Sequence, residues 1–93
     1  MRVRFTGRAF ADREAIFEYL QSKSPAGASK VMSRLRHAIG LLSSGTLSGH
    51  ATDFGAIRVL FIGRYPYKVF FRATADVIEI LAIRHTSRLP DLE

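Results

Sequence analysis

Residues 55–88, with the sequence GAIRVLFIGRYPYKVFFRATADVIEILAIRHTSR, decide how this chain is expected to fold. Three runs within this stretch are rich in Val, Ile and Phe, which favour β-strands. Short segments that contain Gly, Thr, Ala or Asp separate the runs, as turns separate the strands of an antiparallel meander. The stretch therefore predicts three consecutive strands, at residues 56–62, 66–73 and 77–84.

Basic side chains interrupt these apolar runs at intervals. Because successive side chains of a strand point to opposite faces of the sheet, residues of one parity are expected to share a face. The set expected to face the core is Val59, Phe61, Tyr67, Val69 and Phe71. The set expected on the opposite, uncovered face is Arg58, Lys68 and Arg72. The last run is apolar at both parities, which predicts a central strand buried on both sides.

The first half of the chain has the periodicity of one short strand and two helices. Val3 and Phe5 alternate with polar residues, which predicts a strand. Residues 8–22 and 24–42 carry apolar side chains at spacings of three and four, and the second of these segments begins with a serine cap and a proline. Residues 43–55 are rich in Gly, Ser and Thr and predict a loop.

This order of elements predicts an α+β fold, β-α-α-β-β-β. A helical hairpin is expected to pack on one face of a mostly antiparallel four-stranded sheet. The length of 93 residues suits one domain that spans residues 1–93.

Composition narrows the function. The chain has no cysteine and only three histidines, so we expect neither a disulfide nor a metal site nor a cofactor. No apolar run is long enough to cross a membrane, and no signal-peptide core follows Met1, so we expect a soluble cytoplasmic protein. The net charge of +6 favours a polyanionic partner, either nucleic acid or an acidic peptide segment.

Several segments together carry a resemblance to a known family. They are the helix opening with Ala9, Asp12, Ile16 and Tyr19-Leu20, the strands Ile57–Leu60 and Tyr67–Arg72, and the closing run Ile80–Arg88. In this order they resemble the ParE/RelE superfamily of bacterial type II toxin-antitoxin systems, over nearly the whole chain. The closing His-x-x-Arg segment resembles the ParE branch most.

In the ParE branch, the resemblance implies a toxin that inhibits DNA gyrase, or topoisomerase more broadly, without catalytic turnover. It also implies a hetero-oligomer with a cognate ParD-like antitoxin, for example a ribbon-helix-helix protein with an acidic tail. The residues expected to bind the target are Arg84, His85 and Arg88. The residues expected to bind the antitoxin are Arg58, Lys68 and Arg72.

The RelE branch implies a different activity, metal-independent cleavage of messenger RNA on the ribosome. Such cleavage needs a group that activates the ribose hydroxyl, a cation for the charged phosphorane and an acid for the leaving oxygen. The residues available for these roles are Lys68, Arg72, His85 and Arg88. The chain lacks the aromatic residue that many RelE-like toxins carry near the carboxyl end, so the resemblance favours gyrase inhibition over RNA cleavage.

Each candidate residue also has a purely structural interpretation. His85 could cap the end of the last strand, and Arg58 or Arg72 could pair across strands with Glu79 or Asp76. The basic row Lys30, Arg34 and His37 is typical of a solvated helix face. A plain nucleic-acid-binding module stays open as a third class of function, and only the positive charge supports it.

Overall fold

The computed structural model describes residues 1–86 of the chain. Its elements are β1 (Arg2–Phe5), α1 (Gly7–Lys23), α2 (Pro25–Ser43), β2 (His50–Ala51), β3 (Arg58–Phe61), β4 (Tyr67–Ala73) and β5 (Val77–His85). The predicted β-α-α-β-β-β order and the α+β class are confirmed. The sheet has five strands where four were expected, because the short strand β2 forms inside the predicted loop.

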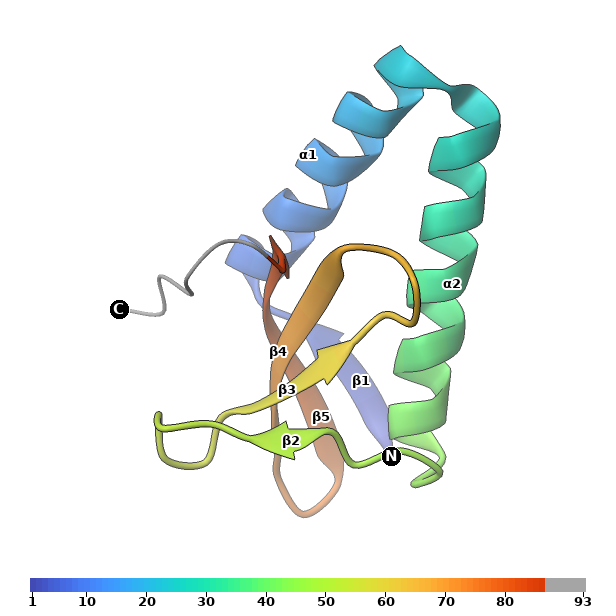
Figure 1. The fold of residues 1–93 in the computed structure, drawn as a ribbon. Helices are drawn as coiled ribbons and strands as arrows, with labels where there is room; N and C mark the ends of the chain where they lie inside the picture. Colours follow the sequence, from blue (N-terminus) through green and yellow to red (C-terminus); the bar gives the residue numbers. More distant parts are fainter. Residues whose placement is uncertain (87–93) are drawn as a thin grey trace.

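The sheet has the strand order β1-β5-β4-β3-β2 (Figure 1). Strands β2 to β5 form an antiparallel meander, whereas β1 pairs in parallel with β5. β5 therefore pairs along both of its edges. Its residues Ile83 and Ala82 are buried in clusters on opposite faces of the sheet, which confirms the prediction of a central strand covered on both sides.

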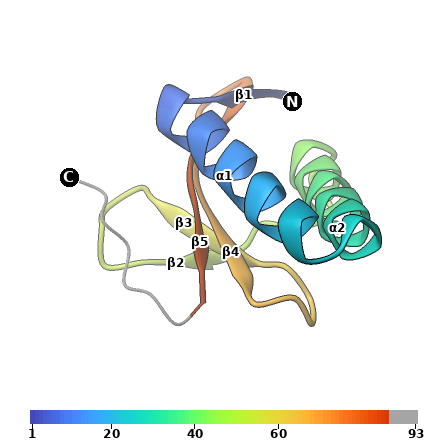
Figure 2. The ribbon, with the colours of Figure 1, turned by 90° about the horizontal axis from the view of Figure 1, so that it is seen from above.

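Both helices lie on the same side of the sheet (Figure 2). The two helices are joined by a tight connection at the top of Figure 1 and diverge toward the strands. Val31, Leu35 and Leu42 of α2 are buried in one cluster with the sheet residues on this side. Burial of a side chain of this size contributes about 1.5–3 kcal/mol, so the helix-side core carries most of the apolar stabilisation.

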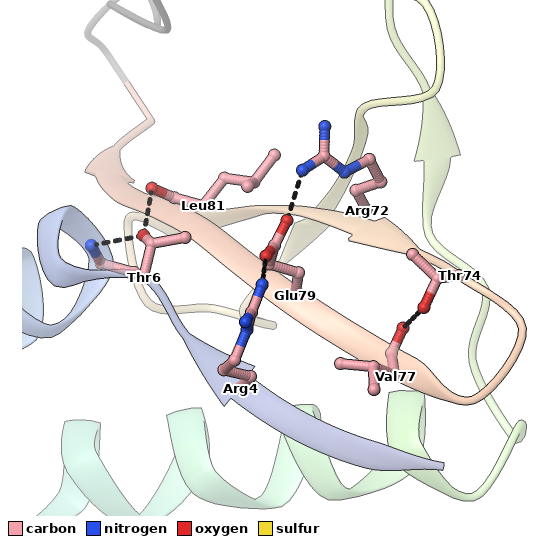
Figure 3. A network of polar contacts seen from close by, with 8 residues as sticks. Arg4, Thr6, Arg72, Thr74, Val77, Glu79 and Leu81 are labelled. Atoms are coloured by element: carbon pink, nitrogen blue, oxygen red, sulfur yellow. Dashed lines mark hydrogen bonds and ion pairs between the residues drawn. The ribbon is translucent and has the colours of Figure 1, made fainter.

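Two capping hydroxyls fix where the helices begin. The Thr6 hydroxyl accepts a hydrogen bond from the Ala9 N–H at 3.1 Å and donates one to the Leu81 carbonyl at 3.2 Å (Figure 3). It thereby starts α1 directly after β1 and ties that start to β5. The Ser24 hydroxyl accepts from the Gly27 N–H at 3.1 Å, and this cap confirms the start predicted for the second helix.

The parity predicted for β3 is wrong. Leu60 lies opposite Val69, and Phe61 lies opposite Lys68. Because directly paired residues share a face, Leu60 and not Phe61 packs on the helix side. Every residue from Val59 to Ile62 is apolar, so alternation could not decide which set faces the helices.

The same register corrects the position of Arg58, which lies opposite Phe71 on the helix side and not on the uncovered face. Its guanidinium donates hydrogen bonds to the carbonyls of Ser48 at 2.8 Å and Gly49 at 3.1 Å. Arg58 therefore fastens the segment that leads into β2. This role differs from the alternative interpretation, in which Arg58 pairs across strands with Glu79 or Asp76.

Gly49 permits this segment to approach the sheet closely. Its φ is +67°, and a Cβ added there would lie 2.7 Å from the Val59 carbonyl oxygen and 2.9 Å from the Phe71 ring. Gly45 offers a matched control, because its φ is +81° but no heavy atom lies within 4 Å of an added Cβ.

We expect Gly45→Ala to lower the free energy of unfolding by about 1 kcal/mol, which is the usual penalty for a left-handed alanine. Gly49→Ala should cost at least about 2 kcal/mol, because overpacking adds to the backbone strain. Urea unfolding of both variants measures the difference. Equal losses would show that the close approach of Gly49 to β3 does not matter.

Candidate functional site

A groove lies between α1 and the end of β5. It has a volume of about 690 Å³, and its floor includes the start of β4. The residues that line it are Asp12, Ala15, Ile16, Tyr19, Pro66, Tyr67, Ile83, Arg84 and His85. The α1 contributors recur at spacings of three and four, so they share one face of the helix. The groove contains two of the three residues predicted to bind the target, Arg84 and His85.

Asp12 fixes the β5 wall of the groove. Its Oδ2 accepts a hydrogen bond from the Ile83 N–H at 2.9 Å, and its Oδ1 lies 2.5 Å from Nη1 of Arg84. β1 pairs with β5 only as far as Ile80, so past that point the carboxylate of α1 satisfies a backbone donor at the edge of β5. The side chains of Asp12 and Arg84 are only 15% and 19% exposed, and the low exposure strengthens the pair.

His85 and Tyr67 form the aromatic part of the groove. The two residues are paired in the β4–β5 ladder, and their rings meet edge to face with centroids 5.7 Å apart. Burial raises the pKa of the Tyr67 phenol above its usual value of 10, and the neighbouring Tyr19 raises it further. The Tyr67 hydroxyl therefore stays protonated at physiological pH and can donate a hydrogen bond into the groove.

The structure separates the remaining predicted residues. Lys68 alternates with Tyr67 and therefore lies on the helix-free face, where its Nζ is 5.6 Å from the Phe70 ring centre. Arg72 lies four residues farther along β4, roughly 13 Å away at the usual strand rise. Arg58 lies on the helix side, so the three residues expected to bind the antitoxin do not form one surface. Arg88 lies outside the described residues.

Glu79 forms ion pairs with two arginines on the face of the sheet that the helices do not cover. Its carboxylate is paired with Arg4 of β1 and Arg72 of β4, which are its neighbours in the two ladders (Figure 3). The cross-strand interpretation of Arg72 is thus confirmed. Hydrogen bonds from Arg4 and then from Arg72 hold the pKa of the Glu79 carboxyl below its ordinary value.

The sequence interpretation missed Asp12 and Tyr67 as parts of the site. Asp12 is 71 residues from the Ile83 N–H that it binds, and no local pattern reports so distant a contact. The available signal was the spacing of Asp12, Ile16 and Tyr19 on one helix face. Among residues 1–86, no cluster of three or more His, Asp or Glu side chains could hold a metal ion. No helix in this part of the chain is long and apolar enough to span a membrane.

The fold and the groove define a small α+β protein with two helices on one face of a five-stranded sheet and a groove between α1 and β5. Residues 3–90 match the family model described as "ParE toxin of type II toxin-antitoxin system, parDE". The chain therefore belongs to the ParE toxin family.

Two relatives agree with this assignment. The chain is 31% identical over 84 residues to a Sinorhizobium fredii (strain NBRC 101917 / NGR234) protein named "Putative toxin Y4kP", and the match covers 90% of this chain and 86% of the relative. It is also similar to a chain of the solved structure titled "Chromosomal ParDE TA system from P. aeruginosa". That match has 26% identity and a TM-score of 0.77, and it covers 91% of this chain and 95% of the other.

The Asp12 contacts predict a graded response to substitution. Asp12→Asn keeps an oxygen for the Ile83 N–H but removes the charge that pairs with Arg84, so we expect it to cost about 1–2 kcal/mol of unfolding free energy. Asp12→Ala removes both contacts and should cost about 2–4 kcal/mol. Urea unfolding measures both values, and Glu18→Ala, on an exposed part of α1, is the control. Equal losses for Asn and Ala would show that the backbone contact contributes nothing.

The lowered pKa of Glu79 predicts an acid-dependent loss of stability. A carboxylate whose pKa is lower in the folded state stabilises the fold fully above its unfolded pKa, near 4.5. That stabilisation disappears as the pH falls through the folded pKa. Unfolding free energies measured from about pH 6 to about pH 2.5 should therefore fall less steeply in Glu79→Gln than in the natural protein. In the control Glu18→Gln, the unfolding free energy should fall with pH as steeply as in the natural protein. An equally steep fall in Glu79→Gln would show that Glu79 does not cause the acid-dependent loss of stability.

Proposed function

We propose that this ParE-family toxin inhibits DNA gyrase through the groove between α1 and β5, without catalytic turnover. Arg84 and His85 offer a cation and an imidazole beside Tyr67 at the rim of a groove large enough for a segment of another protein. Asp12 holds the Arg84 guanidinium in place, so this side chain loses little further freedom when a target binds.

The dispersal of three of the four residues suggested for RNA cleavage, those within residues 1–86, is the single observation that carries this choice. Arg72 is bound to Glu79, Lys68 lies on the helix-free face, and His85 lines the groove on the other side. General acid-base catalysis requires its groups within hydrogen-bonding reach of one substrate position. This arrangement favours a binding protein over a ribonuclease.

A supercoiling assay with purified gyrase tests the proposal. We expect the toxin to inhibit supercoiling and to accumulate cleaved DNA, whereas ribosome-bound messenger RNA stays intact. His85→Ala should weaken the inhibition at least about tenfold, which corresponds to about 1.4 kcal/mol of lost contact energy. The melting temperature should change little, because His85 lies at the end of its strand.

His50→Ala is the matched control for this variant. His50 is an exposed histidine of the edge strand β2, and it does not line the groove. It should leave inhibition unchanged. Cleavage of messenger RNA at discrete codons, lost in Lys68→Ala, would contradict gyrase inhibition and favour the ribonuclease alternative.

We further propose that a cognate antitoxin neutralises the toxin with an acidic, amphipathic segment that binds between the two helices. A second groove, of about 440 Å³, opens there, and its apolar walls include Phe17, Met32 and Ile39. Arg36 stands at this groove and could pair with a carboxylate of the segment, whereas Arg13 already lies 3.6 Å from the carboxylate of Glu14. This surface replaces the set of Arg58, Lys68 and Arg72, which the fold distributes over two faces.

Calorimetry with the product of an adjacent antitoxin gene tests this surface. Phe17 is 38% exposed, and its truncation should weaken binding at least about tenfold, as expected for an aromatic anchor. Phe54 is 52% exposed and lies in the segment between β2 and β3, so Phe54→Ala is the control and should bind normally. Equal effects of the two substitutions would exclude the groove between the helices as the binding surface.

A further inference from the structure

A basic patch covers the outer side of α2 and the turn between β3 and β4. A shallow hollow of about 530 Å³ is lined by the basic side chains of Lys30, Arg34, His37 and Arg64 and by the hydroxyls of Ser29 and Ser33. Figure 1 shows this turn beside the middle of α2. The patch shares no lining residue with the groove of the candidate site.

The fold builds this patch from two separate segments. Lys30, Arg34 and His37 follow one another at spacings of four and three residues, so they form a row about 10 Å long on one helix face. Gly63 brings the turn close to this row. An added Cβ at Gly63 would lie only 3.2 Å from Nη2 of Arg34, so the guanidinium rests against the glycine. The turn then adds Arg64 as a cation beside the row.

No acid neutralises the patch within the described residues. Asp53 is the only acidic residue between positions 19 and 75 of the sequence. The ion pairs found in residues 1–86 use Asp12, Glu14 and Glu79, and none of them includes a cation of the patch. The patch therefore presents an uncompensated positive potential, which attracts polyanions.

The chemistry of the patch suits phosphates better than bases. Exposed ammonium, guanidinium and hydroxyl groups are the usual ligands of backbone phosphates. Recognition of single strands instead depends on aromatic rings that are free to stack on bases. Besides His37, the patch is lined by one aromatic ring, that of Tyr65, which packs against the helix-side core and lies 5.7 Å from the Arg64 guanidinium.

We propose that this patch binds the sugar-phosphate backbone of duplex DNA without sequence preference. The binding itself is independent of gyrase. Its biological role depends on the proposed function, because a toxin that acts on gyrase works beside the DNA that gyrase holds, and contact with that DNA would add to the contact with the enzyme.

Fluorescence anisotropy with a short labelled duplex of mixed sequence tests the proposal across a salt series. Each lost phosphate contact lowers the slope of log affinity against log salt by about 0.9. The double substitution Lys30→Gln and Arg64→Gln should therefore lower the slope by about 2. The control is Lys23→Gln with Arg36→Gln, which removes the same charge outside the patch and should keep the natural slope. All four side chains are exposed, so both variants should fold and melt like the natural protein.

The outcomes separate this inference from the proposed function. An equal loss of slope in both double variants would overturn the inference, because net charge alone would then explain the binding. Tighter binding to single-stranded RNA or to polyglutamate than to the duplex would also overturn it. The assay contains no gyrase. Gyrase inhibition by a protein that does not bind the duplex would therefore refute the patch alone, and duplex binding without inhibition would refute the proposed function alone.

Discussion

The groove between α1 and the end of β5 depends on one carboxylate, that of Asp12. β1 covers the edge of β5 only as far as Ile80, and beyond it the Asp12 side chain replaces a strand by binding the Ile83 N–H. The second oxygen of the same carboxylate holds Arg84. One residue of α1 therefore completes the sheet edge and orients the cation of the groove, so both depend on the same carboxylate.

The other surfaces of the fold differ in whether they carry acidic residues. Asp12 and Glu79 are both engaged with arginines, one at the groove and one on the helix-free face of the sheet. α2 carries no acid at all, so its positive charges are not neutralised within the helix. Part of the positive charge of the chain, which is +6 overall, is therefore concentrated on one helix face and one turn.

Periodicity predicted the helices and the long strands because each depends on contacts within one element or between neighbours. It failed in β3, where three consecutive apolar residues fit either face and only pairing with β4 decides between them. It also missed β2, a two-residue strand fastened by Arg58 and by the close approach of Gly49. The resemblance to the ParE branch pointed to Arg84 and His85, which do line the groove, whereas the contacts of Asp12 required knowledge of the folded chain.

A thermodynamic double-mutant cycle on Asp12→Ala and Arg84→Ala tests the central role of this carboxylate most directly. If the two side chains act as a unit, their effects on unfolding free energy should be non-additive, with a coupling energy of at least about 1 kcal/mol. The Asp12 carboxylate also accepts a hydrogen bond from the Ile83 N–H. Asp12→Ala should therefore still lower the unfolding free energy when Arg84 is absent. Additive effects, with a coupling energy near zero, would contradict the account.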